Sequence, residues 1–584
     1  MVLWMLAPLA IAILISGLDD LVIDVAWAAE WIRNRLRPEA EVFPPGPRQL
    51  ESAPLRRIAV VVPLWHEHEV IARMIEHNLA TIRYPDYHIF AGAYPNDHLT
   101  QDAIRSVAIR FPTVHLVLCP HDGPTSKADC LNWIYQHLGL YEERSGERFD
   151  VVVTHDAEDM IHPDELRWIN FYSARYDFVQ TPVLALQTPV YALIHGIYCD
   201  EFAENHSRDM AVRPLLGGFL PSAGVGTGYR RDALEKLAGA SSGRVFEPDA
   251  LTEDYENGLK LFRLGCSQAF VPISRAEGHR NFVATRELFP QTWRSALRQR
   301  TRWVMGIALQ GWQRHGWGRN PGETYWLWRD RKGLLSNPLG MLANVVFVYG
   351  LATSIWARFP PLATRLVYLT AALQALRMGV RMGCVGRIYG VGFALAVPLR
   401  AVCANALNSS ATVLAVARFA MARARGRPLT WLKTDHSFPS RAALLEHSRK
   451  LGEILVSSGY LTAPALRSAL ATQPAKVRLG EHLIRMGQLS EPRLYEALSL
   501  QQGLPVSDPD PAEIRPGIAH AIPEHVVRRW RVLPFRIEEG RICLASPEVP
   551  SVEMNCALRP FTALEMRFHL VTPGNFEKLA EALL

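Results

Sequence analysis

The stretch FDVVVTHDAEDMIHPDEL, residues 149–166, places five carboxylates directly after an uninterrupted apolar run. The β-branched run predicts a strand that is buried on both faces. Asp156 and Glu158 are separated by one residue, so at the end of a strand their side chains point to the same side. Such a pair either belongs to a solvated turn before a helix that starts near Pro163, or holds a divalent cation such as Mg²⁺. The rest of the chain favours the second interpretation.

Short apolar runs alternate with helical patterns on both sides of this stretch. The alternation predicts an α/β fold with a mostly parallel sheet that is covered on both faces. In open sheets of this kind, ligands bind at the carboxyl ends of the strands, where Asp156 and Glu158 lie. The expected strands are RIAVVVPLW (57–65), YHIFAGAY (87–94), VHLVLCP (114–120), FDVVVTH (149–155) and DFVQTPVLALQ (177–187), and the expected helices are EVIARMIEHNLATI (69–82) and TSKADCLNWIYQHL (125–138).

Length and composition bound the class of protein. At 584 residues the chain is too long for one core, and roughly two to four domains are expected. The net charge of +6 is modest for this size, so no nucleic-acid partner is expected. The eight cysteines are scattered without a CxxC pair, which disfavours a zinc site or a disulfide framework and fits a reducing compartment.

The N-terminal segment MVLWMLAPLAIAILISGL (1–18) has no charge and reaches the minimum length of a membrane-spanning helix. A cleaved signal peptide is the alternative, but the segment lacks a basic n-region and is followed directly by Asp19, Asp20 and Asp24. The first basic residues come after this helix. The positive-inside rule therefore predicts that the chain is cytoplasmic from residue 38 onward.

A second hydrophobic region covers residues 334–420. Residues 334–356 and 362–380 predict two membrane spans, joined by a short turn at Pro360 and Pro361. The segment that follows, residues 388–419, carries Pro398 at its centre and has basic residues on both sides. These features favour a broken hairpin or an interfacial segment over one straight span. A buried helical domain is the alternative for the whole region.

The C-terminal part contains an internal repeat. KLGEILVSSGYLTAPALRSALATQ (450–473) and RLGEHLIRMGQLSEPRLYEALSLQ (478–501) align without gaps at an offset of 28, with eleven identities in 24 positions. The repeat predicts two copies of one helix–turn–helix unit. After it, residues 507–584 combine helical patterns with the short apolar runs RVLPFRIEE, RICLAS and MRFHLV, which predicts a small α/β unit.

Polar motifs follow several elements of the α/β region. They are Glu67 after the first strand, Asp97 after the second, Lys127 and Asp129 at the start of a helix, Glu253 and Asp254 in LTEDYENG (251–258), and the QRTRW segment (299–303). At these positions Glu67 can accept hydrogen bonds from a base or a sugar, and Lys127 lies near phosphates. Singly, each motif has a structural explanation as a cap, a surface lysine, a solvated turn or an amphipathic helix.

In this order the motifs resemble those of a family 2 glycosyltransferase, and within it the membrane-bound processive polysaccharide synthases. The resemblance covers residues 57 to about 435 and implies a GT-A fold. The family's DxD motif is matched here with glutamate in its last position, which keeps the charge. Where such synthases carry paired aspartates after the second strand, this chain has Tyr94, Pro95, Asn96 and Asp97, which leaves the base-contacting role of Asp97 open. The other matches are TED at 252–254, QxxRW at 299–303, GTGYRR at 226–231, and TWLKTDH at 430–436, which is similar to the cytoplasmic gating loop.

The resemblance implies roles for these residues. Asp254, beside Glu253, would be the general base, while Asp156 and Glu158 would bind Mg²⁺ or Mn²⁺ and the diphosphate of a UDP-linked donor. The donor nucleotide would also contact Glu67, Asp97, Lys127 and Asp129. The acceptor and diphosphate would contact Gln299, Arg300, Arg302 and Trp303, and the gating-like loop would use Trp431, Lys433 and Thr434. Metal neutralisation of the leaving group, proton removal by a carboxylate and one displacement would together invert the anomeric centre.

The repeat resembles the MshEN domain, a cyclic di-GMP receptor. In that family an arginine opens each copy and contacts the dinucleotide, and the Leu-Gly turn approaches it. Arg478, Leu479 and Gly480 match this pattern, whereas the first copy begins with Lys450 after Arg449. A plain two-unit helical adaptor is the alternative. The resemblance assigns the dinucleotide to Arg449, Lys450, Leu451, Gly452, Leu455, Gly459, Leu461, Leu466, Leu470, Gln473, Arg478, Leu479, Gly480, Leu483, Gly487, Leu489, Leu494, Leu498 and Gln501.

Together, an N-terminal helix reading ISGLDDLVIDV, the transferase motifs and a terminal MshEN-like repeat resemble the bacteriophage adsorption protein B family. The resemblance implies a multi-pass protein of the bacterial inner membrane that polymerises an envelope exopolysaccharide under cyclic di-GMP control, with an outer-membrane export partner. The expected domains are an N-terminal transmembrane helix (1–37), a linker (38–56), the transferase (57–333), transmembrane or interfacial helices (334–420), a gating-like loop and linker (421–440), the helical repeat (441–506) and the small α/β unit (507–584).

Two other functions fit parts of the sequence. A catalytically inactive transferase fold would make the chain a cyclic di-GMP-binding membrane scaffold of a secretion or phage-adsorption complex, but the complete set of charged motifs disfavours decay. A non-processive lipid glycosyltransferase is the second alternative. QRTRW and the gating-like loop favour chain extension over a single transfer.

Overall fold

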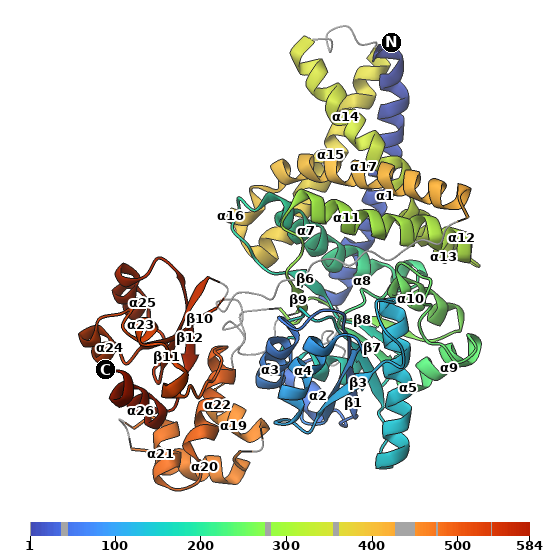
Figure 1. The fold of residues 1–584 in the computed structure, drawn as a ribbon. Coiled ribbons are helices and arrows are strands. Elements are labelled where there is room, and N and C mark those ends of the chain that lie inside the picture. The colour runs from blue at the N-terminus through green and yellow to red at the C-terminus, as the bar shows by residue number, and fades with distance from the viewer. Residues whose placement is uncertain are drawn as a thin grey trace. The chain divides into compact units, whose positions relative to one another are not determined.

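The computed structural model describes residues 2–36, 45–274, 282–353, 361–426, 450–458, 460–474, 477–538 and 540–584. The chain divides into two compact units whose boundary along the sequence lies between Phe438 and Pro439. Figure 1 shows the fold of both. The gating-like residues Trp431, Lys433 and Thr434, together with Arg449 and Gly459, lie outside the described residues.

A mostly parallel sheet forms the centre of the first unit, as the alternating pattern predicts. Its strand order is β3-β2-β1-β4-β7-β5-β8, and β7 is its one antiparallel strand among the described residues. The order reverses between β1 and β4, which makes their carboxyl ends the switch point of the sheet. The strands are β1 (Ile58–Pro63), β2 (Tyr87–Ala93), β3 (Val114–Leu118), β4 (Val151–Thr154), β5 (Phe178–Gln180), β7 (Thr227–Arg230) and β8 (Gln268–Phe270).

The single strand expected over residues 177–187 is wrong. The segment forms two strands, β5 and β6 (Val183–Ala185), and β6 pairs with β9 (Thr285–Glu287) in a separate two-stranded sheet. Pro182 stands between them, and proline cannot donate a ladder hydrogen bond. The split allows the chain to leave the main sheet just beyond its carboxyl edge.

Helices cover the sheet, and their apolar faces explain the burial. Phe90 and Val152 from the strands pack with Ile134 and Leu234 from helices in one core cluster. The helices of this unit are α1 (Val2–Leu36), α2 (Pro47–Ser52), α3 (Ile71–Thr81), α4 (His98–Ala108), α5 (Lys127–Ser145), α6 (Glu165–Tyr172), α7 (Leu193–Glu204), η2 (Asn205–Asp209), α8 (Met210–Val212), η3 (Pro214–Leu216), α9 (Arg231–Ala240), α10 (Glu253–Arg263), α11 (Trp293–Trp303), η4 (Val304–Gln310), α12 (Gly311–His315), α13 (Pro321–Arg331), α14 (Gly333–Thr353), α15 (Pro361–Tyr389), α16 (Val391–Ala394) and α17 (Val397–Ala424).

Helices far apart in the sequence lie side by side beyond the sheet. α1 packs against both α14 and α15, and the end of this bundle projects away from the sheet (Figure 1). α17 packs against α14 of this bundle and also runs beside α11 and α7, with Arg400, Leu407 and Ala411 buried. α15 also contacts α7, so both the bundle and α17 adjoin the helices next to the α/β core.

The hairpin that the sequence allows within residues 388–419 is wrong, because α17 is one continuous helix. Its proline, Pro398, lies in the first turn, where a missing N–H costs no intrahelical hydrogen bond. The break in the segment comes earlier, between α16 and α17. Pro361 likewise begins α15 rather than lying in a turn.

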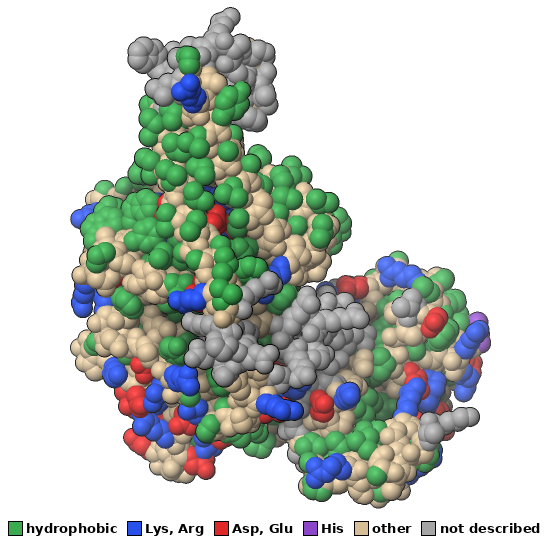
Figure 2. All heavy atoms as spheres, turned by 180° about the vertical axis from the view of Figure 1, so that it is seen from behind, with side chains coloured by type: hydrophobic (Ala, Val, Ile, Leu, Met, Phe, Trp, Pro, Cys, Tyr) green, Lys and Arg blue, Asp and Glu red, His purple; other side chains and the backbone are tan. Residues whose placement is uncertain are grey.

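Hydrophobic side chains gather on the outside of these helices (Figure 2). Among the described residues, one helix, Val397–Ala424, is long and apolar enough to cross a membrane by length and composition, and Gly333–Val346 is apolar but shorter. The exposed apolar side chains include Ile11, Ile15, Leu18, Val22 and Val25 on α1, Leu335, Val345 and Val348 on α14, Tyr368, Leu369 and Leu376 on α15, and Leu399, Val402, Val413 and Val416 on α17.

The second unit begins with the predicted repeat. Two helix pairs, α19 (Leu451–Ser457) with α20 (Ala463–Thr472) and α21 (Leu479–Arg485) with α22 (Glu491–Gln502), confirm the duplicated helix–turn–helix. A Cβ atom at Gly452 would lie 2.8 Å from Leu466 Cδ1, and one at Gly480 would lie 2.6 Å from Leu494 Cδ1. The glycine of each copy therefore permits close packing of its own two helices.

A small α/β layer completes the second unit. β10 (Leu533–Glu538) pairs antiparallel with β11 (Arg541–Ser546), which pairs parallel with β12 (Glu565–Leu570). These strands confirm the three apolar runs seen in the sequence. The accompanying helices are η6 (Pro511–Glu513), α23 (Pro516–Ala519), α24 (Glu524–Trp530), α25 (Val552–Leu558), η7 (Arg559–Phe561) and α26 (Pro573–Leu583).

Candidate active site

A cavity of about 660 Å³ opens at the switch point of the main sheet. Trp65 and Glu67 reach it from the end of β1, and Asp156 and Glu158 reach it from the end of β4. Because the carboxyl ends of adjacent parallel strands meet at one edge, residues nearly a hundred positions apart face the same space. The position predicted for the carboxylate pair is therefore the edge of a real cavity.

Glu253 and Asp254 enter the cavity from the first turn of α10. The glycine loop before β7 makes room for them: Gly224 has φ +83°, and a Cβ there would lie 2.4 Å from Asp254 Oδ2. α11 and η4 hold the other side, because Gly306 packs against Thr252 and the Arg302 Nη1 donates to the Leu251 carbonyl at 3.4 Å. The motifs predicted to act together are thus packed against one another.

Burial and like charge make these two carboxylates easy to protonate. Burial first, and then the charge of Asp254, raises the pKa of Glu253 to about 7. Burial also raises the pKa of Asp254, although Lys127 and Arg302 oppose that shift. A carboxylate whose pKa approaches neutrality is suited to accept a proton during a reaction.

Lys127 lies between the two carboxylate pairs. Its Nζ is 2.6 Å from Asp156 Oδ1, and a Cβ at Gly224 would lie 3.4 Å from the same Nζ. Burial alone would lower the pKa of Lys127, but the charges of Asp156, Glu253 and Asp254 raise it. The lysine is therefore a fixed cation at the centre of the site, where a phosphate group would find a donor.

Another carboxylate, Glu287 at the end of β9, lies near the DAED turn (residues 156–159) and was not predicted from the sequence. It lines the cavity, and burial together with the charges of Asp159, Glu158 and Asp156 raises its pKa well above the usual range. The sequence feature that could have indicated Glu287 is its place at the end of a short strand, two positions before Phe289, which also lines the cavity.

The donor chemistry here fits a hard divalent cation. Asp156, Glu158 and Glu287 offer only oxygen ligands, and their mutual repulsion would be relieved by a positive ion. Among the described residues no preformed group of three or more His, Cys, Asp or Glu ligands is present. Mg²⁺ bound by one or two carboxylates and completed by substrate phosphates needs no such group.

A buried histidine supports the DAED turn. His155 Nδ1 is 2.8 Å from Asp159 Oδ2 and its Nε2 is 3.1 Å from Glu165 Oε1, and Asp159 Oδ2 accepts the Asp156 backbone N–H at 3.0 Å. Burial alone would lower the pKa of His155, but hydrogen bonds to Asp159 and Glu165 raise it to about 9. The imidazolium therefore fixes the backbone that carries Asp156.

The QRTRW residues divide between the cavity and the protein interior. Gln299, Arg302 and Trp303 line the cavity. Arg300 does not: its Nη1 lies 2.8 Å from Glu201 Oε2, and its guanidinium stacks over the Tyr198 ring at 4.4 Å. Arg300 therefore lies on the side of α11 that faces α7 and ties the two helices together.

Two further predicted donor contacts lie outside this cavity. Asp97 caps α4 by accepting from the Thr100 N–H at 3.4 Å and also accepts the His66 N–H at 2.7 Å, so backbone donors occupy both of its oxygens. Asp129 accepts from Thr125 Oγ1 at 2.8 Å. Glu67 remains at the cavity, and the base of a nucleotide would meet Trp65 and Tyr94, which also line it.

Comparison with known proteins decides the relationship. Bacteriophage adsorption protein B of Escherichia coli (strain K12) is 34% identical over 597 residues, which cover 97% of this chain and 80% of that protein. This chain belongs to the bacteriophage adsorption protein B family. Bacteriophage N4 adsorption protein B of Escherichia coli O157:H7 matches with the same identity and coverage. The family relationship predicted from the helix, transferase and repeat is confirmed.

Models of two protein families match parts of this family member. "Glycosyltransferase like family 2" matches residues 54–306, and "MshEN domain" matches residues 502–584. The chain is therefore a glycosyltransferase with a GT-A-like α/β domain and a C-terminal MshEN domain. The MshEN match begins at the end of the helical repeat, so residues 450–501 lie before it.

Two solved structures resemble parts of the chain. "Mannosyltransferase PcManGT from Pyrobaculum calidifontis in complex with GDP-Man and Mn2+" is 19% identical and covers 68% of this chain and 98% of its own, with a TM-score of 0.41. "Structure of MshE with cdg" is 25% identical and covers 23% of this chain and 99% of its own, with a TM-score of 0.21.

Several repeat positions assigned to the dinucleotide are core residues of the second unit. Leu455 and Leu483 are fully buried, and Leu461 and Leu489 are nearly so. Arg478 differs, because 81% of its side chain is exposed and its nearest acidic contact, Glu548, is 3.9 Å away. These leucines of the motif thus build the helix pairs, and Arg478 is left accessible to a ligand.

Proposed function

We propose that the protein polymerises an envelope exopolysaccharide from a UDP-linked sugar, by single displacement with inversion, under control of cyclic di-GMP. The observation that carries the transferase part of the proposal is the convergence of five charged groups on one cavity. Asp156, Glu158, Glu253 and Asp254 place four carboxylates around one lysine, Lys127. This excess of negative charge suits a divalent cation, whose remaining ligands would be oxygens of the donor diphosphate.

The donor end of the cavity follows from these residues. Asp156 and Glu158 would hold Mg²⁺ or Mn²⁺, which supplies charge neutralisation at the leaving diphosphate when bound. Lys127 would donate to a phosphate oxygen, and Glu67 would accept a hydrogen bond from the nucleoside. His155 keeps the DAED turn in place through Asp159.

Asp254 is the proposed general base. Held by Gly224 on one side and by the α11–η4 packing on the other, its carboxylate would accept the proton of the acceptor hydroxyl. Glu253 raises the proton affinity of the pair by its own charge. Gln299, Arg302 and Trp303 would position the acceptor and the departing diphosphate, since all three line the same cavity.

Placement in the bacterial inner membrane rests on the helices outside the α/β core. We propose that α1, α14 and α15 cross the membrane and that α17 lies at its surface, because α17 buries one face against α7 and α11 while its other face is apolar and exposed. Two crossings after residue 333 keep both the transferase and the second unit in the cytoplasm, with their nucleotides. An outer-membrane export partner would receive the polymer.

Regulation is assigned to the repeat. Arg478 is exposed at the N-terminus of α21, where the backbone N–H groups of the helix also favour an anion. Lys450 holds the equivalent position before α19. We expect the guanidinium of Arg478 to contact cyclic di-GMP.

The decisive experiment measures UDP release by the purified full-length protein in a membrane mimic, with a panel of UDP-sugars, Mg²⁺ or Mn²⁺, and with or without cyclic di-GMP. Turnover of one sugar that rises with the dinucleotide supports the proposal. The matched control is Arg478→Ala, which should keep basal turnover and lose the response. Cyclic di-GMP binding without turnover of any sugar would instead support the scaffold alternative.

A further inference from the structure

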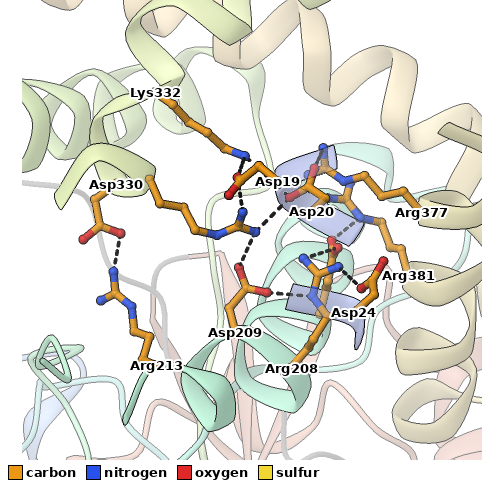
Figure 3. Close-up of polar contacts among 12 residues, drawn as sticks. Asp19, Asp20, Asp24, Arg208, Asp209, Arg213, Asp330, Lys332, Arg377 and Arg381 are labelled. Carbon is orange, nitrogen blue, oxygen red and sulfur yellow. Dashed lines mark hydrogen bonds and ion pairs between the residues drawn. The ribbon is translucent and has the colours of Figure 1, made fainter. Parts of the chain in front are cut away.

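The cavity does not end at the transferase carboxylates but continues to a cluster of ion pairs beside α1. This cluster, called here the charge cluster, is drawn in Figure 3. It consists of Asp19, Asp20 and Asp24 from α1, Glu204 from α7, Arg208 and Asp209 from η2, Arg213 after α8, Arg329 and Asp330 from α13, Lys332 after α13, and Arg377 and Arg381 from α15.

The pairs of the charge cluster are short and buried. Asp20 Oδ2 lies 2.6 Å from Arg377 Nη1, its Oδ1 accepts from Arg329 Nη2 at 2.8 Å, and 2% of its side chain is exposed. Arg208 lies 2.6 Å from Asp24 and 2.7 Å from Asp209. The distinctive SGLDDL stretch of α1 is therefore tied by these contacts to the same unit that holds the active site.

Most of the charge cluster forms the wall of the cavity. All of its members except Asp19 and Asp24 line the same cavity as Asp156 and Asp254. Phe289, Trp303 and Trp326 line it as well. Aromatic faces combined with convergent polar groups are the usual lining of a ligand site.

The charges of the whole cluster cancel. Four of its carboxylates and its six cations line the cavity, and Asp19 and Asp24, which do not line it, neutralise Arg329, Lys332 and Arg208, which do. The charge cluster has six carboxylates and six cationic side chains, each with an oppositely charged partner within 4 Å. Over the whole cavity, the described lining residues include eleven carboxylates and eight Lys or Arg side chains. A phosphate or carboxylate ligand needs excess positive charge, because burying an uncompensated anion is costly.

We infer that this wall is the acceptor site of the enzyme and that it accepts an uncharged sugar chain. A hydroxyl donates to a carboxylate and accepts from a guanidinium, so alternating acids and bases satisfy a polyhydroxyl ligand without a net charge on either side. Asp20 of the first helix is then a specificity-determining residue. The inference rests on the proposed transferase function and adds the chemical class of its acceptor.

The test uses full-length protein in lipid nanodiscs and follows quenching of tryptophan fluorescence, which needs no turnover. The probes are neutral tetrasaccharides of glucose and of N-acetylglucosamine, their C6-carboxylated counterparts, and undecaprenyl phosphate. A neutral tetrasaccharide should bind at least about tenfold more tightly than its carboxylated counterpart and than the lipid phosphate.

Asp20→Asn should weaken binding of the neutral tetrasaccharide about tenfold and reduce discrimination against the carboxylated one, since it removes a wall carboxylate. Asp24→Asn is the matched control, because Asp24 lies on the same helix as Asp20 and pairs with Arg208 of η2 but does not line the cavity. Its discrimination should remain that of the wild type, whatever it does to thermal stability.

Three results overturn the inference: no saturable binding of any neutral tetrasaccharide, tighter binding of a carboxylated probe or of the lipid phosphate, and equal effects of Asp20→Asn and Asp24→Asn. The proposed function fails separately. A protein that binds a neutral tetrasaccharide but releases no UDP from any donor refutes the transferase and leaves the acceptor site standing.

Discussion

The two ends of one cavity handle charge in opposite ways. At the transferase end, Asp156, Glu158 and Glu287 repel one another, and Lys127 is the cation that the structure places nearest to Asp156. At the other end, every carboxylate of the charge cluster has a cationic partner. The difference shows that buried charge by itself does not mark chemistry. An unbalanced set of charges needs a charged ligand to compensate it, whereas a balanced set is compensated without one.

The largest expected effect tests the unbalanced end. Asp254→Asn should lower UDP release roughly 10³-fold, since a general base contributes about that much, while thermal stability holds or rises because like-charge repulsion with Glu253 is removed. Glu256→Gln is the matched control on the same helix. Glu256 is buried beside Arg314 and His315, so its loss should lower stability and change turnover less than about threefold. The reverse pattern would contradict the comparison.

A second substitution examines the metal. Glu158→Gln, or Asp156→Asn, should lower transfer by roughly 10²-fold and raise the Mg²⁺ concentration needed for half-maximal rate. Fold and membrane insertion should stay intact, because both changes reduce the repulsion by Glu287 and the amide oxygen introduced at position 156 can still accept a hydrogen bond from Lys127. Initial rates over a Mg²⁺ series provide the measurement. Full activity in either variant would remove the metal assignment.

The pH profile sharpens the comparison further. The pKa of Glu253 is raised to about 7, and that of Asp254 is also raised, so the pair holds a proton below neutrality. We expect kcat/KM to rise with pH and level off above about 7, where the base is fully ionised. Glu253→Gln removes the neighbouring charge and should move this acidic limb down by roughly one pH unit. If the acidic limb does not move, Glu253 does not influence the pKa of the general base.

The last prediction concerns the support of the DAED turn by His155, and its expected effect is on stability. The pKa of His155 is raised from 6.5 to about 9, so its stabilisation is complete below pH 6.5 and is lost as pH rises through 9. His155→Gln should therefore reduce stability by about 3 kcal/mol at pH 6 and by much less near pH 10. Thermal unfolding in nanodiscs at both pH values checks this window. A difference that does not depend on pH would mean that the imidazole acts by packing alone.

Local pattern was enough to place several parts of the site. The carboxylates at 156 and 158 end a buried strand, and Glu253 and Asp254 begin a helix, because strand and helix periodicities are short-range properties. Asp97 and Arg300 show the limit of the same reasoning. Each belongs to a recognisable motif, yet Asp97 caps a helix and Arg300 pairs with Glu201. Which face of a helix meets a cavity depends on its neighbours.

Other features needed contacts between distant segments. Glu287 joins the active site because Pro182 splits the fifth expected strand and lets β6 pair with β9 beyond the main sheet. Leucines at the repeat positions would fit both a ligand-binding motif and an ordinary helical core, and burial places Leu455, Leu483 and Leu494 in the core but leaves Leu470 exposed.

The sequence by itself determined the α/β alternation, the family, the duplicated helix pair and the positions of the carboxylate motifs, because residue type and spacing are enough to specify them. Only the tertiary structure decided which residues Asp20 contacts. It lies on the first helix, more than three hundred residues before Arg377, and its charge has meaning only where α1, η2, α13 and α15 meet. Coulomb interactions act over a few ångströms in space and take no account of separation along the chain.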